Sequence, residues 1–233
     1  RKSKMKHQVL ENPVKNQTSS DLYLAAIACL TVTFYLAANI LAVKAIIVGD
    51  LVLFDAGTIT FPFAYMLGDT LTEIWGFKTA RRVIWITFFC NALLIGFTSL
   101  GLLIPAPDYT PGVDVAYAQI FGYVPRIVAA SLIAFLFGEL SNAWMMEKIR
   151  EKTGRKLLFV RTIGSSVLGY VFDTVIFVLI AFGGTAPVRD LMSMIGVQYI
   201  TKLGVEAIAG TPLAYALIAY LRRRRAQSIS ESR

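Results

Sequence analysis

Six polar side chains attract attention because they lie inside long apolar runs of the sequence. They are Asn39, Asp69, Glu73, Glu139, Asn142 and Asp173. Asp69 and Glu73 are four residues apart in FPFAYMLGDTLTEIWG (61–76), so on a helix they share one face. An ionisable group at the centre of a bilayer costs roughly 2.5–3.5 kcal/mol on insertion scales, so each acid needs a partner or a function.

The cations of the same runs have simpler explanations. Lys44 lies near the outer end of its run and can extend its amine to the headgroups. Lys202 and Glu206 are four residues apart and can neutralise each other on one helix. The four acids then outnumber the cations, so some must be protonated, line water or await a ligand. The sequence therefore predicts a polar cavity, although Asn39, Asn91 and Asn142 can also serve as interhelical hydrogen-bonding residues.

The segment that carries Asp69 and Glu73 also contains residues that interrupt helices. Gly57, Pro62 and Gly68 precede the two acids, and proline cannot donate a backbone hydrogen bond. Broken helices at membrane depth are tolerated where they line a cavity, and a broken helix with polar groups is typical of a transporter site.

Composition places the whole chain in a lipid environment. Of 233 residues, 56% are hydrophobic and 16% charged, with a mean hydropathy of +0.61. Soluble domains carry about 25% charged residues. We predict an all-α polytopic membrane protein with six transmembrane helices, at about 22–47, 57–76, 82–104, 124–147, 160–182 and 192–221. The loop at 105–125 is expected to hold a short interfacial helix or a lid.

Basic residues predict the orientation. Of the 23 lysines and arginines, 19 fall on the two termini and on the connections after the second and fourth predicted helices. The positive-inside rule then makes both termini cytoplasmic. The net charge of +8 is thus a topology signal, and no nucleic-acid partner is expected. We expect a disordered basic cytoplasmic tail at 1–20, a membrane domain at 21–222 and a basic cytoplasmic tail at 223–233.

Enzymatic and metal chemistry have no recognisable motif. Nucleotide-binding loops, zinc-protease motifs and hydrolase elbows are missing from the sequence. Cys29 and Cys90 lie in apolar runs and His7 lies in the basic tail, so neither a metal nor a cofactor is expected. Carboxylates without such motifs suit the binding and translocation of a small polar solute with N–H donors.

Longer stretches resemble a known family. FYLAANILAVKAI, FDAGTITFPFAYMLGDTLTEIWGFKTARRVIW, RIVAASLIAFLFGELSNAW and RTIGSSVLGYVFDTVIFVLIAFGG are similar to the queuosine precursor transporter family, also called the vitamin uptake transporter family. The resemblance covers roughly residues 22–222. It implies six helices in a bacterial inner membrane. It also implies uptake of 7-cyano-7-deazaguanine and 7-aminomethyl-7-deazaguanine for salvage into the modified tRNA base queuosine.

The implied substrate matches the acids. A deazaguanine presents an N1–H and a 2-amino group side by side, and one carboxylate can accept both. We expect Asp69 or Glu73, with Glu139 or Asp173, to bind that edge, while Asn39 or Asn142 binds the carbonyl. The choice within each pair stays open. Assembly as a homo-oligomer also stays open. Two other functions remain as alternatives: a substrate-capture subunit of an energy-coupling-factor vitamin importer, and an intramembrane enzyme.

Overall fold

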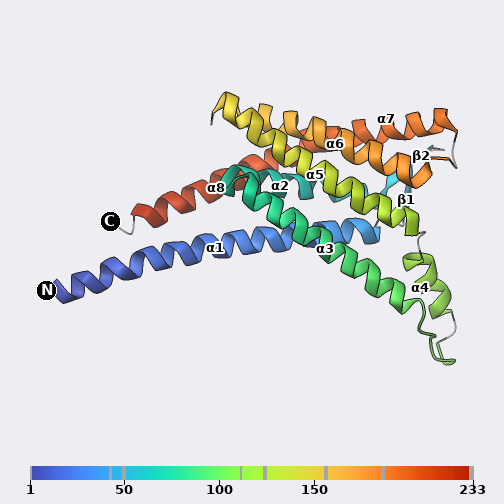
Figure 1. Ribbon diagram of the computed structural model, residues 1–233, viewed down its shortest axis with the longest axis horizontal. Coiled ribbons are helices and arrows are strands. Elements are labelled where there is room, and N and C mark those ends of the chain that lie inside the picture. Colours follow the sequence, from blue (N-terminus) through green and yellow to red (C-terminus); the bar gives the residue numbers. More distant parts are fainter. Residues whose placement is uncertain are drawn as a thin grey trace.

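The apolar runs of the sequence fold mainly as long helices that lie side by side in an elongated bundle (Figure 1). The computed structural model describes residues 2–41, 44–48, 51–110, 112–122, 125–154, 157–184 and 187–230. In chain order its elements are α1 (Lys2–Leu41), β1 (Ala45–Val48), β2 (Leu51–Asp55), η1 (Ala56–Ile59), α2 (Phe61–Trp75), α3 (Phe77–Gly101), α4 (Val113–Phe121), α5 (Pro125–Thr153), α6 (Leu158–Phe182), α7 (Val188–Val205), η2 (Glu206–Gly210) and α8 (Thr211–Ser230). η1 is a 3₁₀ turn, and η2 is a π-helical turn that joins α7 to α8.

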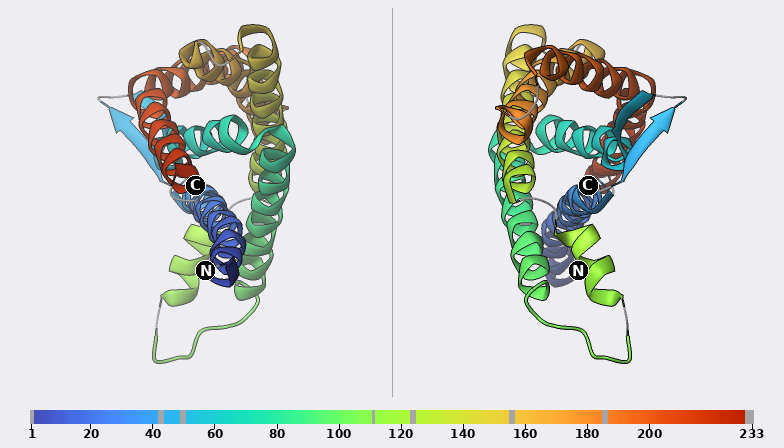
Figure 2. Two further views of the ribbon diagram at one scale, coloured as in Figure 1. Left: turned by 90° about the vertical axis from the view of Figure 1, so that its left-hand side faces the viewer. Right: turned by 90° about the vertical axis from the view of Figure 1, so that its right-hand side faces the viewer.

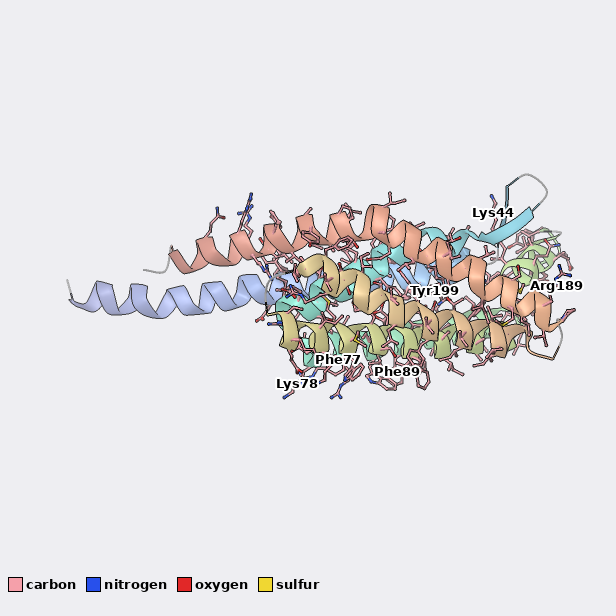
Figure 3. All side chains as sticks on the ribbon, turned by 90° about the horizontal axis from the view of Figure 1, so that it is seen from above. Lys44, Phe77, Lys78, Phe89, Arg189 and Tyr199 are labelled. Carbon is pink, nitrogen blue, oxygen red and sulfur yellow. The ribbon has the colours of Figure 1, made fainter. Side chains whose placement is uncertain are left out.

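Five helical stretches in the described part of the chain are long and apolar enough to cross a membrane. They are Asp21–Leu41, Phe77–Gly101, Ala129–Thr153, Leu158–Phe182 and Leu191–Arg224. Large apolar side chains cover their outer surfaces; Phe89 on α3 is 59% exposed and points away from the bundle (Figure 3). These stretches confirm five of the six predicted membrane helices, since each coincides with one predicted run.

The predicted second helix, at 57–76, is shorter than expected. η1 precedes it, and α2 has only 15 residues, which is roughly 22 Å of helix against a hydrocarbon core of roughly 30 Å. Pro62 lies in the first turn of α2, where a missing N–H does not interrupt the hydrogen bonds, so it starts the helix instead of breaking it. Seen along the bundle, α2 crosses the interior between the other helices (Figure 2).

The first predicted helix needs correction at both ends, although the protein is overwhelmingly helical as predicted. α1 ends at Leu41, and β1 and β2 form an antiparallel hairpin with Ala45 opposite Asp55, where we predicted helix up to residue 47. The strands are AIIV and LVLFD, and such β-branched and aromatic residues favour extended structure. At its other end α1 begins at Lys2, so the tail that we expected to be disordered is helical there. The predicted short helix of the 105–125 loop is α4.

Both termini lie at the same end of the bundle, which we call the terminal end (Figure 1). The α2–α3 junction and the α5–α6 connection lie at this end too, whereas the hairpin and α4 lie at the opposite end. Lys78 is at the terminal end, and Lys44 and Arg189 are at the other (Figure 3). The basic segments used for the orientation therefore share one side of the molecule. Of that set, Arg1, Arg155, Lys156 and Arg233 lie outside the described residues.

From the positive-inside rule we predict that the terminal end faces the cytoplasm. A fluorescent protein fused after α8 should therefore fluoresce in intact cells, and alkaline phosphatase at the same position should be inactive. The same fusions placed between Pro107 and Gly112, at the opposite end, should give the reverse pattern. Active phosphatase at the C-terminus would contradict the orientation.

Close packing of α5 on α6 depends on two glycines. A Cβ at Gly169 would lie 2.9 Å from the Asn142 Cβ and 3.1 Å from the Gly138 backbone oxygen. A Cβ at Gly138 would lie 2.7 Å from the Asp173 Cβ. The two backbones can approach only because both side chains are hydrogen. This contact sets how far apart the polar residues of α5 and α6 can be.

The substitution Gly169→Ala should therefore lower the thermal unfolding midpoint of the purified protein, by the equivalent of about 1–3 kcal/mol for an overpacked interior. Gly96→Ala on α3 is the matched control, because a Cβ there meets nothing within 4 Å. Equal midpoints for the two variants would show that the α5–α6 contact does not limit stability.

Candidate functional site

Buried polar side chains from α1, α2, α5, α6, α7 and η2 meet inside the bundle. We call this set the polar centre: Tyr35, Tyr65, Asp69, Glu139, Asn142, Tyr170, Asp173, Lys202 and Glu206, each at most 5% exposed. Its members are joined by hydrogen bonds, by one ion pair and by close packing around Gly138 and Gly169. It contains four of the six site residues that the sequence predicts.

Asp69 is the acid of α2 that points into this centre. Its Oδ1 accepts a hydrogen bond of 2.9 Å from the Asn142 side-chain amide of α5. Its Oδ2 is buried and accepts no hydrogen bond from the described residues. Asp69 thus has one oxygen held by a neutral donor and one oxygen available to a ligand.

Glu139 approaches the same helix from α5. Its Oε1 accepts a hydrogen bond of 2.5 Å from the Tyr35 hydroxyl of α1. Its Oε2 lies 2.8 Å from the position of a Cβ at Gly68, so the carboxylate rests directly against the α2 backbone one residue before Asp69. Glycine at position 68 leaves room for this carboxylate, which a side chain there would displace.

Asp173 and Lys202 form a buried ion pair between α6 and α7, with 2.5 Å between Nζ and Oδ2. We predicted that Lys202 would pair with Glu206 along one helix, and that pairing is wrong. The contact of α6 with α7 brings the Asp173 carboxylate to the lysine instead. Asp173 is therefore charge-compensated, whereas Glu206 is not neutralised by this lysine in the way we expected.

Glu206 is the first residue of the π-helical turn η2 and is fully buried. Its Oε2 accepts a hydrogen bond of 3.2 Å from the Tyr170 hydroxyl. The Tyr170 ring packs on the Tyr65 ring, with 4.3 Å between their centroids. Asp69 and Glu139 both interact electrostatically with Glu206, so the three carboxylates share one region.

Glu73, the second acid of α2, has a different environment. Its Oε1 accepts hydrogen bonds from Arg161 of α6, at 2.9 Å, and from Arg222 of α8. We counted Arg161 only as a loop charge, but it is fully buried. These ion pairs join the C-terminal end of α2 to α6 and α8, and they do not belong to the polar centre. The sequence does place this arginine in the first turn of an apolar helix, which marks a cation to be buried but not the acid that it pairs with.

Asn39 lies outside the polar centre. Its side-chain amide donates to Asn91 of α3 at 2.5 Å, and its Oδ1 accepts from Ser131 of α5 at 3.0 Å. This arrangement matches the alternative reading of the asparagines as interhelical hydrogen-bonding residues. Tyr35, one turn earlier on α1, is the residue of this helix that reaches the acids, and no pattern in the sequence distinguished it.

Several buried oxygens of the polar centre have no hydrogen-bond partner among the described residues. They are Tyr65 Oη, Asp69 Oδ2, Glu139 Oε2, Asn142 Oδ1 and Glu206 Oε1, together with Ser166 Oγ and Thr174 Oγ1 on α6. Leaving one such group unpaired costs roughly 1–3 kcal/mol. Buried polar groups of folded proteins are normally hydrogen-bonded, so these oxygens call for partners beyond the described residues, and a polar ligand is one such partner.

Membrane-length helices around a buried polar centre define a multi-pass membrane protein with a polar interior. Residues 55–217 match the family model described as "Putative vitamin uptake transporter". The match covers most of the sequence, so the chain belongs to the vitamin uptake transporter family.

Three curated relatives are similar to the chain. A Bacillus subtilis (strain 168) protein named "Probable queuosine precursor transporter" is 30% identical over 69% of each chain. A Haemophilus influenzae protein of the same name is 27% identical over 76% of this chain and 73% of its own length. The Escherichia coli (strain K12) "Queuosine precursor transporter" is 26% identical over 72% of this chain and 74% of its own. No solved structure matches the chain.

The substitution Glu73→Gln should destabilise the protein strongly, because it leaves buried Arg161 without its countercharge. Breaking a buried pair from one side costs about 3–5 kcal/mol. The matched control is Glu151→Gln, which removes a half-exposed ion pair with Lys148 and should change stability by less than about 1 kcal/mol. Similar unfolding midpoints for both variants would show that the buried ion pairs of Glu73 stabilise the protein no more than an exposed ion pair does.

Proposed function

We propose that this protein imports queuosine precursors across a bacterial inner membrane and binds them at the polar centre. The observation that carries the proposal is Asp69, a fully buried carboxylate with one oxygen held by Asn142 and the other without a partner among the described residues. Membership of the vitamin uptake transporter family supports it, and so do the names of the three relatives.

The candidate substrates are 7-cyano-7-deazaguanine and 7-aminomethyl-7-deazaguanine. Both present an N1–H and a 2-amino group that together form a fork of donors, which suits a carboxylate. Asp69 is the better acceptor of the two acids on α2, because Arg161 and Arg222 already occupy Glu73. The second N–H of the Asn142 amide can donate to the ring carbonyl while the first holds Asp69.

Glu139 is the second acid that we assign to binding. It lies against Gly68, beside Asp69, and its Oε2 has no hydrogen-bond partner in the described part of the chain. The paired rings of Tyr65 and Tyr170 offer a flat surface next to these acids, and flat heterocycles stack on such surfaces. Asp173 is a weaker candidate than our sequence reading suggested, since Lys202 neutralises it.

A solute can reach the polar centre only when helices separate, because the side chains there are buried. In transporters with sites at mid-membrane, groups of helices rock against each other around a fixed site. Here the short helix α2 contacts α1, α3, α5 and α8, so movement of α2 would alter the surroundings of Asp69 from several sides.

The substitution Asp69→Asn should weaken binding of both deazaguanines by about 10- to 100-fold, because an amide lacks the charge that strengthens two N–H contacts. Uptake of labelled precursor into cells that lack other importers should fall correspondingly. The half-exposed Glu151→Gln variant is the control and should transport like the wild type.

Normal uptake by Asp69→Asn and by Glu139→Gln would rule out the polar centre as the binding site. Uptake by the purified chain alone in vesicles would separate this function from the substrate-capture subunit of an energy-coupling-factor importer, which needs ATPase partners.

A further inference from the structure

Resting on the proposed function, we propose that Glu206 binds the positively charged aminomethyl group of 7-aminomethyl-7-deazaguanine and so sets the preference between the two precursors. The two molecules share the deazaguanine ring and differ in one substituent. At neutral pH the aminomethyl group is a primary ammonium, whereas the cyano group is uncharged. Discrimination between them therefore requires a carboxylate that contacts only the substituent.

The charges of the polar centre leave such a carboxylate. Asp69, Glu139, Asp173 and Glu206 are four buried acids, and Lys202 pairs with Asp173. Among the described residues, no lysine or arginine nitrogen lies within ion-pair distance of the other three. One of these three acids can accept the two N–H groups of the ring, so the others remain to accept a positively charged group. Buried charges are stable when an opposite charge accompanies them, which a cationic substrate would supply.

Glu206 differs from the other uncompensated acids in its local backbone. It begins the π-helical turn Glu206–Gly210, and π-turns inside helices occur frequently at functional sites. A Cβ at Gly210 would meet the Glu206 carboxylate, with its Oε1 at 3.0 Å, so the carboxylate is folded over the turn itself. Glycine at position 210 leaves the space that the carboxylate occupies.

The tyrosines beside Glu206 supply a second, independent observation. The Tyr65 hydroxyl is 1% exposed and has no partner among the described residues; it approaches Gly138 of α5, within 2.8 Å of a Cβ placed there. Its ring packs against that of Tyr170, which holds Glu206 by a hydrogen bond. An ammonium next to Glu206 would thus meet a carboxylate and the hydroxyl oxygen of Tyr170, beside the packed rings of Tyr170 and Tyr65, all of which favour a cation.

Glu139 is less suited to this role. The Tyr35 hydroxyl and the α2 backbone at Gly68 enclose its carboxylate beside Asp69, where the ring of the substrate is expected. Glu206 comes from a different element and lies against the tyrosine pair. Two acids at the ring and one at the substituent therefore account for all three uncompensated carboxylates.

The test is the affinity of the purified full-length protein for each precursor, measured by equilibrium binding with Glu206→Gln. This variant keeps an oxygen for the Tyr170 hydroxyl and removes the charge. We expect affinity for the aminomethyl compound to fall at least tenfold and affinity for the cyano compound to change by less than about threefold. Asp69→Asn, measured in parallel, should lower the affinity for both compounds to a similar extent.

The outcomes separate the two proposals. If the wild-type protein binds neither compound, the proposed function fails. Suppose instead that the wild type binds both compounds and that Glu206→Gln leaves the ratio of the two affinities unchanged, with both affinities lowered or neither. The role of Glu206 is then overturned, and the proposed function stands. Tyr170→Phe provides a second test should Glu206→Gln not fold. It removes the hydroxyl that holds Glu206, and it should shift the same ratio in the same direction by a smaller factor, while an unchanged ratio would overturn the inference.

Discussion

The Glu73 carboxylate accepts hydrogen bonds from Arg161 and Arg222 inside the bundle, and these contacts connect α2 to α6 and α8. Charged groups removed from water need such partners, because an unpaired buried charge is far more costly than the pair. With one acid of α2 neutralised at the terminal end, the short helix is held inside the ring of longer helices (Figure 2). Asp69, one turn earlier, is then placed in the middle of the bundle.

Two classes of buried acid result, and they explain how one protein can contain both a stable interior and a binding site. Glu73 and Asp173 have arginine or lysine partners and join helices. Asp69, Glu139 and Glu206 have only neutral partners, an asparagine or a tyrosine, and each keeps an oxygen that no described residue contacts. Neutral donors orient a carboxyl group without supplying a countercharge, so these three acids differ from Glu73 and Asp173 in having no cationic partner among the described residues.

Glycines determine how closely these groups assemble. Gly138 and Gly169 let α5 and α6 approach until Asn142 and Asp173 face the same interior. Gly68 gives the Glu139 carboxylate a place against α2, and Gly210 does the same for Glu206 in the π-turn. Each glycine is thus explained by the polar group that occupies the space of its missing side chain. The polar centre and the helix packing are two aspects of one arrangement.

Composition and periodicity alone determined that this is a helical membrane protein, because burial in lipid demands long apolar runs. They also identified Asp69, Glu139, Asn142 and Asp173 as interior groups, since polar residues in such runs are costly. Local sequence could not show partners far apart in the chain: Arg161 for Glu73, Lys202 for Asp173, Tyr35 for Glu139 and Tyr170 for Glu206. It also missed the hairpin at 45–55 and the shortness of α2. Tertiary structure decided which acids have a cationic partner, because that depends on which helices pack together and not on spacing along one helix.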